Sequence, residues 1–294
     1  MQQTFNLVIV IPVGPGTVPE FLFDNIHSIL RYVKGSFKII LADDSHEGLG
    51  KLTQQQFPEL SIDVVPTPKP MGRVCGLYIT LSWAYKHAID HYHFGALQKF
   101  DTDALLIGDD PAREAIEMFR TQPEIGMAGQ YPNDYNGEPW DVSWPRQEIL
   151  KICTTISFFR KPITHWALLT AYRKALRNGY KTGESVFGGS YFISEKALRA
   201  LDKMKRLPDH RLKTVNLEED HVFPILVKAA GMKFGDLSSS SLPFACTWRG
   251  LPASPEELYE RGKRIIHSTR FWKERKEAEI RQFFKEKREQ TSAL

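Results

Sequence analysis

The chain has 294 residues, of which 42% are hydrophobic and 25% charged, and its formal net charge is +4. This composition excludes a chain that is disordered throughout and is sufficient for the core of one large domain or two small ones. The charge is small for this length, and Lys and Arg are spread along most of the chain. The sequence therefore does not indicate a nucleic-acid-binding protein.

The first part of the chain alternates between predicted strands and helices. Four short apolar runs are expected as buried strands: 7–13, 37–42, 60–65 and 95–100. Two segments with apolar residues at helical spacing are expected as helices: 18–33 and 77–89. This alternation predicts a right-handed α/β layer with a mainly parallel sheet, whose ligands bind beyond the carboxyl ends of the strands.

The second part of the chain has fewer clear signals. Helices are expected at 111–119, 195–201 and 216–230, a turn and strand at 185–192, and an ordered loop at 131–144. From Ser254 onward the chain is charged and helical in propensity, and Ser254, Pro255 and Glu257 form a plausible helix start.

Asp101 and Asp103 form the sharpest acidic feature, because they follow a predicted strand at i and i+2 spacing and their carboxylates are expected to point the same way. Mg²⁺ and Mn²⁺ prefer oxygen ligands and are commonly held by one or two carboxylates together with substrate phosphates. The pair favours a metal site that bridges a diphosphate, with a simple turn closed by aspartates as the alternative. We assign Asp109 and Asp110 to structure, with Asp110 as the N-cap of a helix that begins at Pro111.

Asp43 and Asp44 close the second predicted strand, where a carboxylate can accept hydrogen bonds from a ribose or a base. The alternative is an Asx turn followed by a helix cap. Arg73 lies between Gly72 and Gly76, and its forked donors suit a base or a phosphate, although an ordinary surface arginine fits the composition equally well.

Three further features are candidates for a site. Gly188 and Gly189 permit a close backbone approach or a positive-φ turn. The acidic run 218–220 opens a predicted helix, and its structural explanation is Asn216 as a cap with acidic residues in the first turn. His267 is a candidate third metal ligand, with a structural or exposed histidine on a basic helix as the alternative.

Taken in order, these segments resemble the GT-A glycosyltransferases, especially the family-2-like group. The resemblance covers residues 5–270 and is carried by IPV at 11–13, ADDS at 42–45, the Gly-Arg stretch at 72–76, DTD at 101–103, FGG at 187–189, EED at 218–220 and IIHS at 265–268. It implies a GT-A domain at 1–250, with a nucleotide-binding half at 1–105 and an acceptor half at 106–250, followed by a basic helical extension at 251–294.

The resemblance also implies roles for individual residues. The nucleotide, commonly uridine, would be bound by Pro12, Val13, Asp43, Asp44, Arg73, Asp101 and Thr102. The metal would be held by Asp101, Asp103 and His267, with Asp103 as the more direct carboxylate ligand. The catalytic base would be Asp220, with Glu219 beside it. Apart from the resemblance, the donor or acceptor sugar is expected near Gly188, Gly189 and Trp140, and the alternative for Trp140, as for the other aromatic residues of the loop 131–144, is that it covers the core.

The expected function is therefore Mn²⁺- or Mg²⁺-dependent transfer of a sugar from a nucleotide-sugar, a UDP-sugar by the resemblance, to an acceptor hydroxyl of a glycan or glycoconjugate. The resemblance implies inversion. No glycine separates Asp44 from Ser45, so the aspartate that meets the base stays open, and no QxxRW-like pattern follows the acidic run, which favours non-processive transfer.

Two other functions remain as alternatives. A nucleotidyltransferase that makes a nucleotide-sugar is disfavoured because no Lys or Arg precedes Arg31. A non-catalytic carbohydrate-binding protein with a degenerate transferase fold is disfavoured because both acidic motifs are retained.

Cysteine usage and apolar runs give the expected location. The three cysteines are far apart and odd in number, and no run approaches the about 20 apolar residues that cross a bilayer, so we expect a cytoplasmic protein or one peripheral at the inner face of a membrane. The segment 261–288 combines basic and aromatic residues, which favours either peripheral contact with an anionic membrane or packing on the domain or on a second subunit.

Overall fold

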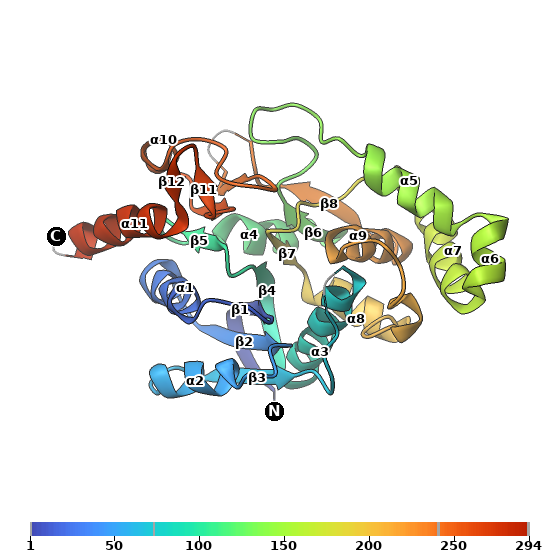
Figure 1. Cartoon of the computed structure of the whole chain (residues 1–294), viewed down its shortest axis with the longest axis horizontal. Helices are drawn as coiled ribbons and strands as arrows, with labels where there is room; N and C mark the ends of the chain where they lie inside the picture. The colour runs from blue at the N-terminus through green and yellow to red at the C-terminus, as the bar shows by residue number, and fades with distance from the viewer. Residues whose placement is uncertain (1, 73, 240–241, 293–294) are drawn as a thin grey trace.

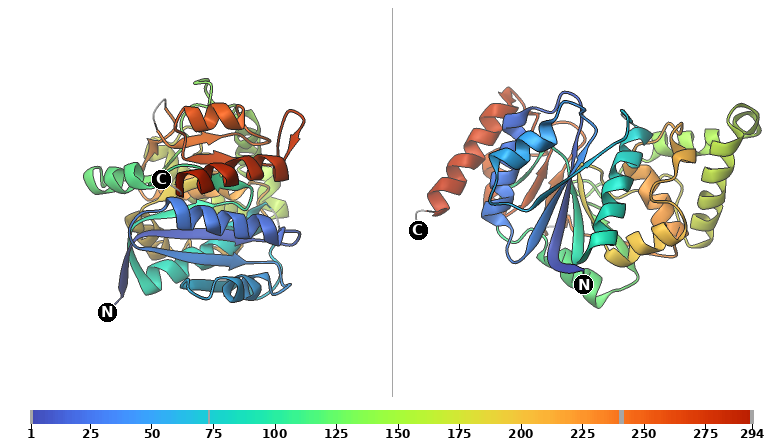
Figure 2. Two further views of the ribbon diagram at one scale, coloured as in Figure 1. Left: turned by 90° about the vertical axis from the view of Figure 1, so that its left-hand side faces the viewer. Right: turned by 90° about the horizontal axis from the view of Figure 1, so that it is seen from below.

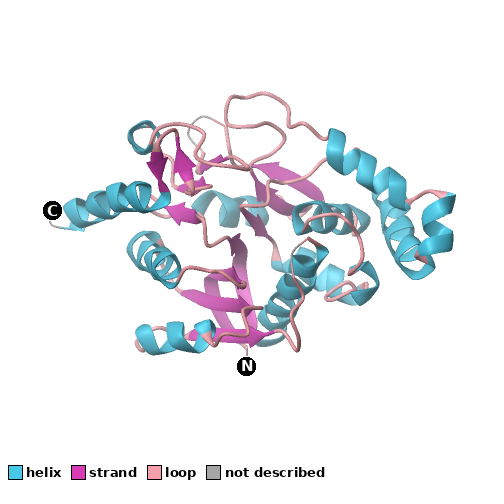
Figure 3. Ribbon diagram, in the orientation of Figure 1, coloured by secondary structure: helices cyan, strands magenta, loops and turns pink. Residues whose placement is uncertain are grey.

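The computed structural model describes residues 2–72, 74–239 and 242–292, which are built around a seven-stranded sheet of order β3-β2-β1-β4-β7-β6-β8 (Figures 1 and 3). Strand β7 runs antiparallel to both of its neighbours, and the other pairs are parallel. The expected α/β class with a mixed, mainly parallel sheet is confirmed. Its strands are β1 (Gln3–Val13), β2 (Phe37–Asp43), β3 (Ile62–Pro66), β4 (Tyr92–Phe100), β6 (Ile125–Gly129), β7 (Ser190–Ile193) and β8 (Lys233–Asp236).

Smaller sheets and helices complete the chain. A three-stranded sheet and a hairpin are formed by β5 (Ala104–Leu106), β9 (Phe244–Cys246), β10 (Ile265–His267), β11 (Phe271–Trp272) and β12 (Arg275–Lys276). The α-helices are α1 (Pro19–Tyr32), α2 (Leu49–Gln56), α3 (Cys75–His91), α4 (Arg113–Thr121), α5 (Ser143–Ile152), α6 (Thr155–Arg160), α7 (Pro162–Arg177), α8 (Glu195–Lys203), α9 (Glu219–Ala229), α10 (Pro255–Glu260) and α11 (Glu277–Ser292). None of the described helices is long and apolar enough to span a bilayer.

The central sheet is covered on both faces, which explains the unbroken apolar run in β1. Leu7 and Ile9 belong to one buried cluster together with α1 and α4, whereas Val8 and Val10 belong to a second cluster together with α3, α8 and α9. Figure 1 shows α1 and α2 on one side of the sheet and α3 and α8 on the other. A strand enclosed in this way needs apolar side chains at every position, as the sequence predicts.

The helical propensity after Ser254 is only partly realised. Helix α10 begins as expected, since Ser254 Oγ accepts a hydrogen bond of 3.1 Å from the backbone N–H of Glu257. The chain then forms β10, which pairs antiparallel to β5 and parallel to β9. The prediction that His267 would lie on a basic helix is wrong, because Ile265 and Ile266 are buried between two strands, and tertiary packing overrides local helical propensity.

Two predicted helix caps are also wrong. Helix α4 begins at Arg113, and Asp110 lies before it with a φ of 51°, so Asp110 is not its N-cap. The N-cap residue of α9 is Glu218, and Asn216 instead donates a 3.1 Å hydrogen bond to Glu148. Asp109 accepts a hydrogen bond of 2.9 Å from Arg31 at the surface.

Residues 143–177 form three helices for which the sequence shows no clear signal. Helices α5, α6 and α7 extend from the sheet at one end of the molecule (Figures 1 and 2). Helix α7 packs on α9, and its inner face carries the buried residues Leu168 and Ala171. The opposite end of the molecule is formed by α11, which lies against α1 and buries Ile280 and Phe284.

Candidate active site

The Asp-Thr-Asp motif forms a turn between β4 and β5. The backbone N–H of Ala104 donates a 3.0 Å hydrogen bond to the carbonyl of Asp101, which closes the turn. Ligand atoms of Asp101, Asp103 and His267 all lie within 4.8 Å of one another. Two carboxylates and an imidazole are donors that suit a divalent cation such as Mn²⁺. The turn and the end of β10 thus bring together all three residues that the sequence predicts as metal ligands.

His267 faces this turn with a fixed ring orientation. Its Nδ1 lies 2.8 Å from the carbonyl oxygen of Thr247 and donates to it, which leaves Nε2 directed at Asp103 Oδ1, 3.3 Å away. Burial lowers the pKa of His267, but the hydrogen bond to Asp103 and the nearby carboxylates outweigh burial and raise it above its ordinary value. A second partner that fixes the ring is the usual arrangement of a metal-binding histidine.

The residues that follow β10 hold Asp103 in place. The backbone N–H of Thr269 donates a 2.8 Å hydrogen bond to the Asp103 carbonyl, and Ser268 Oγ donates a 3.0 Å bond to the carboxylate. Arg270 Nε lies 2.8 Å from the same carboxylate. Burial raises the pKa of Asp103, but His267 and Arg270 lower it more, so the carboxyl is held well below its usual range. Asp103 is therefore an ionised carboxylate in a fixed position.

Lys99 is a central residue of the site that the motifs do not indicate. Its side chain is 0% exposed, and its Nζ lies 2.6 Å from Asp101 Oδ2 and 3.0 Å from Glu219 Oε1. A buried lysine requires such partners. Lys99 lies on β4, two residues before Asp101. Because side chains alternate between the two faces of a strand, this spacing predicts that Lys99 and Asp101 point the same way. It joins the Asp-Thr-Asp turn to the start of α9.

The acidic residues at the start of α9 lie at the same centre. Glu219 is buried against Lys99, and Asp220 Oδ1 is buried without a hydrogen-bond partner among the described residues. Burial, reinforced by the charge of Glu219, raises the pKa of Asp220 to about 8. The structural explanation of these acids is wrong in its cap, since Glu218 and not Asn216 is the N-cap residue, but Glu219 and Asp220 do lie in the first turn of α9 as that explanation requires. His221 Nε2 lies 3.6 Å from Asp220 Oδ1, which is too far for a hydrogen bond. A buried carboxyl oxygen without a hydrogen-bond donor, in a group with a pKa near neutrality, is a candidate general base.

Gly188 and Gly189 place the two halves of the site next to each other. A β-carbon at position 188 would lie 2.6 Å from Asp220 Oδ2, and one at position 189 would lie 2.2 Å from the His267 ring. The backbone N–H of Asp101 also donates a 3.1 Å hydrogen bond to the Gly189 carbonyl. The glycine pair thus lies between Asp220 and the three candidate metal ligands, where any side chain would collide with one or the other.

The carboxyl ends of β1 and β2 lie together, as the predicted nucleotide site requires, but Asp43 and Asp44 are engaged within the chain. Asp43 accepts hydrogen bonds from Ser45 and from the backbone N–H of Gly50, as in the expected Asx turn. Asp44 accepts from Thr67 and from the backbone N–H groups of Met71 and Gly72. Arg73 lies outside the described residues.

The two strand ends are tied together by the backbone. Pro12 pairs in register with Ala42, and the carbonyl of Val13 accepts a 2.7 Å hydrogen bond from the backbone N–H of Asp44. Thr102 contributes its carbonyl to hydrogen bonds from Asn25 and Arg281. The backbone at these positions is therefore held in a defined arrangement.

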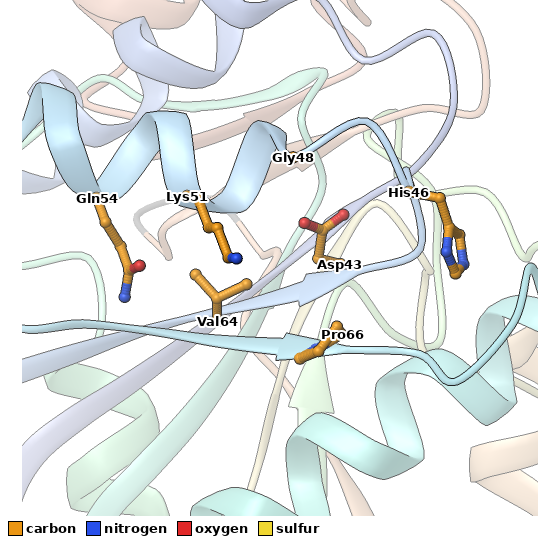
Figure 4. Close-up of a pocket in the computed structure, with 7 residues that line it drawn as sticks. All are labelled: Asp43, His46, Gly48, Lys51, Gln54, Val64 and Pro66. Atoms are coloured by element: carbon orange, nitrogen blue, oxygen red, sulfur yellow. The ribbon is translucent and has the colours of Figure 1, made fainter.

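A cavity of about 380 Å³ adjoins Asp43 at the edge of the sheet. Figure 4 shows its lining, with Lys51 and Gln54 from α2 lying over Val64 of β3 and with the Asp43 carboxylate directed toward the start of α2. His46 lies at one end of the cavity on the loop that follows β2. The cavity offers three nitrogen-bearing side chains, on His46, Lys51 and Gln54, near the carboxyl end of β2.

Three aromatic side chains lie near His267: Phe187, Trp140 and Trp248. Trp140 stacks on Phe187 with ring centroids 5.0 Å apart, and the edge of Phe187 meets His267 at 5.5 Å. One face of the Trp140 ring is therefore covered by protein. Trp248 follows Thr247, the partner of His267, and its ring is 66% exposed. Trp248 is not among the residues selected from the sequence, and the guanidinium of Arg249 lies over its ring, 4.5 Å from the centroid.

Solved structures of GT-A-type glycosyltransferases are similar to this chain. A mannosyltransferase, PcManGT from Pyrobaculum calidifontis in complex with GDP-Man and Mn²⁺, has a TM-score of 0.47 and 11% identity, over 85% of this chain and 61% of that one. S. aureus TarS 1-349 in complex with UDP has a TM-score of 0.48 and 13% identity, over 87% and 63%. Mouse xyloside xylosyltransferase 1 in its apo form has a TM-score of 0.47 and 11% identity, over 90% and 97%.

No protein-family model and no curated protein matches the chain. The chain spans 61% and 63% of the lengths of the mannosyltransferase and of TarS 1-349. At these identities and scores, the similarity to the solved glycosyltransferases is one of fold and carries no statement about the reaction.

Proposed function

We propose that the protein is a metal-dependent glycosyltransferase that moves a sugar from a nucleotide-sugar, with UDP as the nucleotide, to an acceptor hydroxyl with inversion. The observation that carries the proposal is that the Asp220 carboxyl, whose Oδ1 accepts no hydrogen bond from the described residues, lies across Gly188 and Gly189 from the Asp101, Asp103 and His267 group. A base beside a cation site is the arrangement that displacement of a diphosphate requires.

The donor atoms present fit Mn²⁺ or Mg²⁺. Asp103 and Asp101 would hold the cation through oxygen, and His267 would do so through Nε2, because its Nδ1 is already bonded to Thr247. A cation bound there supplies positive charge that stabilises the departing diphosphate. Arg270, which is 63% exposed and contacts Asp103, is placed to add a second positive charge toward the phosphates.

Asp220 is the residue that would take the proton of the acceptor hydroxyl. Its Oδ1 is free to accept a hydrogen bond, and its raised pKa makes it a stronger base than an exposed aspartate. Glu219 acts beside it by holding Lys99. An exposed tryptophan such as Trp248 suits stacking on an acceptor sugar, whereas Trp140 supports Phe187 and the His267 ring.

The nucleotide would bind across the carboxyl ends of β1 and β2. Pro12 and Val13 offer backbone there, and Asp43 and Asp44 shape the loops around it through their internal hydrogen bonds. Residues beyond 250 belong to this catalytic unit, because His267 lies on β10.

Three variants test the proposal by donor turnover and by thermal stabilisation with UDP, GDP and ADP, each with and without Mn²⁺. Asp103→Ala should lose Mn²⁺-dependent stabilisation by the nucleotide together with transfer. Asp220→Asn should keep that stabilisation and lose transfer by about 10²-fold or more. Asp109→Asn, at an exposed aspartate paired with Arg31, is the matched control and should behave as the wild type.

Two results contradict the proposal. The first is normal transfer by folded Asp103→Ala and Asp220→Asn. The second is the absence of stabilisation by any nucleoside diphosphate with any divalent cation. Release of pyrophosphate from a nucleoside triphosphate and a sugar phosphate would instead identify a nucleotidyltransferase. Nuclear magnetic resonance of the anomeric proton of the product decides between inversion and retention.

A further inference from the structure

The outer face of α6 and of the first turn of α7 exposes large apolar side chains next to one another. Ile156 is 67% exposed, Phe159 76%, Ile163 67% and Trp166 53%. The ring of Phe158 connects them, because it lies 5.3 Å from Phe159 and 6.1 Å from Trp166. Single exposed apolar residues are ordinary, but a contiguous group of this kind marks a surface that contacts something else. We call these four exposed residues the apolar tip.

The helices that carry the apolar tip are strongly basic. Residues 143–177 contain one acidic residue, Glu148, and seven basic residues: Arg146, Lys151, Arg160, Lys161, Arg173, Lys174 and Arg177. The excess of six positive charges in this segment exceeds the net charge of +4 of the whole chain, so the remainder is slightly acidic. Residues 143–177 are therefore one of two strongly basic segments of the chain, and the other is 261–288, which holds eleven Lys and Arg residues and four Glu residues.

Most of these cations are available to a partner. Lys151 pairs with Glu148, and Lys161 donates to the carbonyl of Thr214. Within the described part of the chain, no carboxylate lies within ion-pair distance of the other five basic residues, which are all exposed: Arg146, Arg160, Arg173, Lys174 and Arg177.

The apolar and cationic residues follow one another along one face of α7. Ile163 and Trp166 are three residues apart, and Arg173 and Arg177 follow Trp166 by two and three helical turns, so all four point the same way. These exposed positions span about 20 Å from the apolar end to the cationic end. The face therefore changes from apolar to positive along the helix axis.

We propose that α6 and α7 dock the protein on an anionic lipid surface, with the apolar tip in the interface between headgroups and acyl chains. Arg160, Arg173 and Arg177 then contact the lipid phosphates. Exposed Trp and Phe with flanking Arg are the side chains that such an interface accommodates, and they enter it by about 5–10 Å. No helix spans the bilayer in this arrangement, in accord with the lengths and polarities of the described helices.

Charge and packing favour this occupant over the alternatives. A second copy of the chain placed symmetrically on this face would bring two sets of unpaired arginines together, which repel each other. The C-terminal helix, in the other basic and aromatic segment, buries Phe284 and pairs Arg281 and Arg288 with Asp24, so these three side chains are engaged within the protein. In the described part of the chain, the ring contacts of the apolar tip are with Phe158 and His165 of α6 and α7 themselves, and all four of its side chains stay more than half exposed.

The test is flotation of the full chain with vesicles of phosphatidylcholine alone and of phosphatidylcholine with about one third phosphatidylglycerol. Phe159→Ser with Ile163→Ser removes two residues of the apolar tip, and Arg173→Glu with Arg177→Glu reverses two charges. The matched controls are Leu52→Ser, at an exposed leucine of α2, and Lys276→Glu with Lys285→Glu, two exposed cations at α11. Urea unfolding checks that each variant folds.

The wild type should float with the anionic vesicles, and added salt should weaken its binding. Each double variant of α6 and α7 should lower the partition coefficient by more than about tenfold, while the controls stay within about twofold of the wild type. Quenching of tryptophan fluorescence by brominated lipid should be smaller in Trp166→Phe than in the wild type. This measurement also tests contact of α7 with lipid if the Phe159→Ser, Ile163→Ser variant fails to fold.

Three outcomes would overturn the proposal. These are a wild type that floats with neither vesicle, variants of α6 and α7 that float as the wild type does, and loss of flotation in the α11 control alone. A dimer seen by light scattering that dissociates in Phe159→Ser with Ile163→Ser, without flotation, would assign the face to a second copy instead. None of these measurements depends on nucleotide or sugar, so this inference stands or falls separately from the proposed reaction.

Discussion

Gly189 leaves the space that the His267 ring fills: a β-carbon at position 189 would lie 2.2 Å from Cγ of that ring. The two residues lie 78 positions apart in the sequence and meet because the start of β7 passes the end of β10. At the preceding residue, Gly188, a β-carbon would lie 2.6 Å from Oδ2 of the Asp220 carboxylate. A pair of adjacent glycines therefore permits both the candidate base and a candidate metal ligand to approach one backbone segment.

We predict that Gly189→Ala weakens Mn²⁺ binding, because the added methyl group must displace the His267 ring from Asp103. We expect a loss of affinity of about tenfold or more, similar to the loss of a residue that orients a ligand. Mn²⁺ titration followed by electron paramagnetic resonance measures the effect. Gly14→Ala is the control, since a β-carbon there meets nothing within 4 Å. Equal Mn²⁺ affinity in the two variants would contradict the assignment of His267 as a ligand.

Lys99→Met should destabilise the protein, because it leaves the partly buried carboxylate of Asp101 and the buried carboxylate of Glu219 without their shared cation. Removal of one partner from a buried ion pair costs about 3–5 kcal/mol. Urea unfolding measures the free energy of unfolding. Addition of Glu219→Gln in the same chain should restore part of the loss, since it removes one of the two uncompensated charges. A double variant no more stable than Lys99→Met would show that Glu219 is not the coupled partner.

Arg281→Lys should weaken Mn²⁺ binding although Arg281 contacts no ligand side chain. Its guanidinium donates to the carbonyl of Thr102 at 2.6 Å and to Thr269 Oγ1 at 3.2 Å, and it thereby holds the Asp-Thr-Asp turn against β10 and α1. An ammonium group cannot reproduce these forked contacts. We expect a stability loss of about 1.5–3 kcal/mol.

The control for Arg281→Lys is Arg288→Lys, at an arginine two turns farther along α11 that contacts Asp24. Both variants should lower the free energy of unfolding, but only Arg281→Lys should lower the affinity for Mn²⁺. If the two variants reduce the affinity equally, the effect belongs to the docking of α11 as a whole and not to the turn.

The rate of transfer should rise with pH up to about pH 8. A general base acts in its deprotonated form, and burial raises the pKa of Asp220 to about 8, so the carboxyl is largely protonated at lower pH. The rate at saturating Mn²⁺ should fall about tenfold for each pH unit below that pKa. In Glu219→Gln the profile should move to lower pH, because the charge of Glu219 contributes to the raised pKa. A profile independent of pH between about pH 6 and pH 8 would exclude Asp220 as the base.

Elements whose amphipathic or apolar pattern is strong were predictable from the sequence. The strand at 7–13 and the helix at 77–89 appear as β1 and α3, since enclosure by two layers requires continuous apolar side chains. Short edge elements were not predictable. Strands β9 and β10 have three residues each and owe their conformation to pairing with each other and with β5. Helix α6, which exposes Ile156 and Phe159, does not show the polar outer face that identifies a surface helix.

The α/β class and the acidic motifs at the ends of strands could be predicted from the amino acids alone, because side-chain periodicity and strand polarity are local properties of the chain. Which polar residues contact one another depends on the folded arrangement. Lys99 became the cation shared by Asp101 and Glu219, His267 came to lie on a strand facing Asp103, and Asp43 and Asp44 were taken up by internal hydrogen bonds. These outcomes depend on contacts between segments far apart in the chain, which local propensity does not encode.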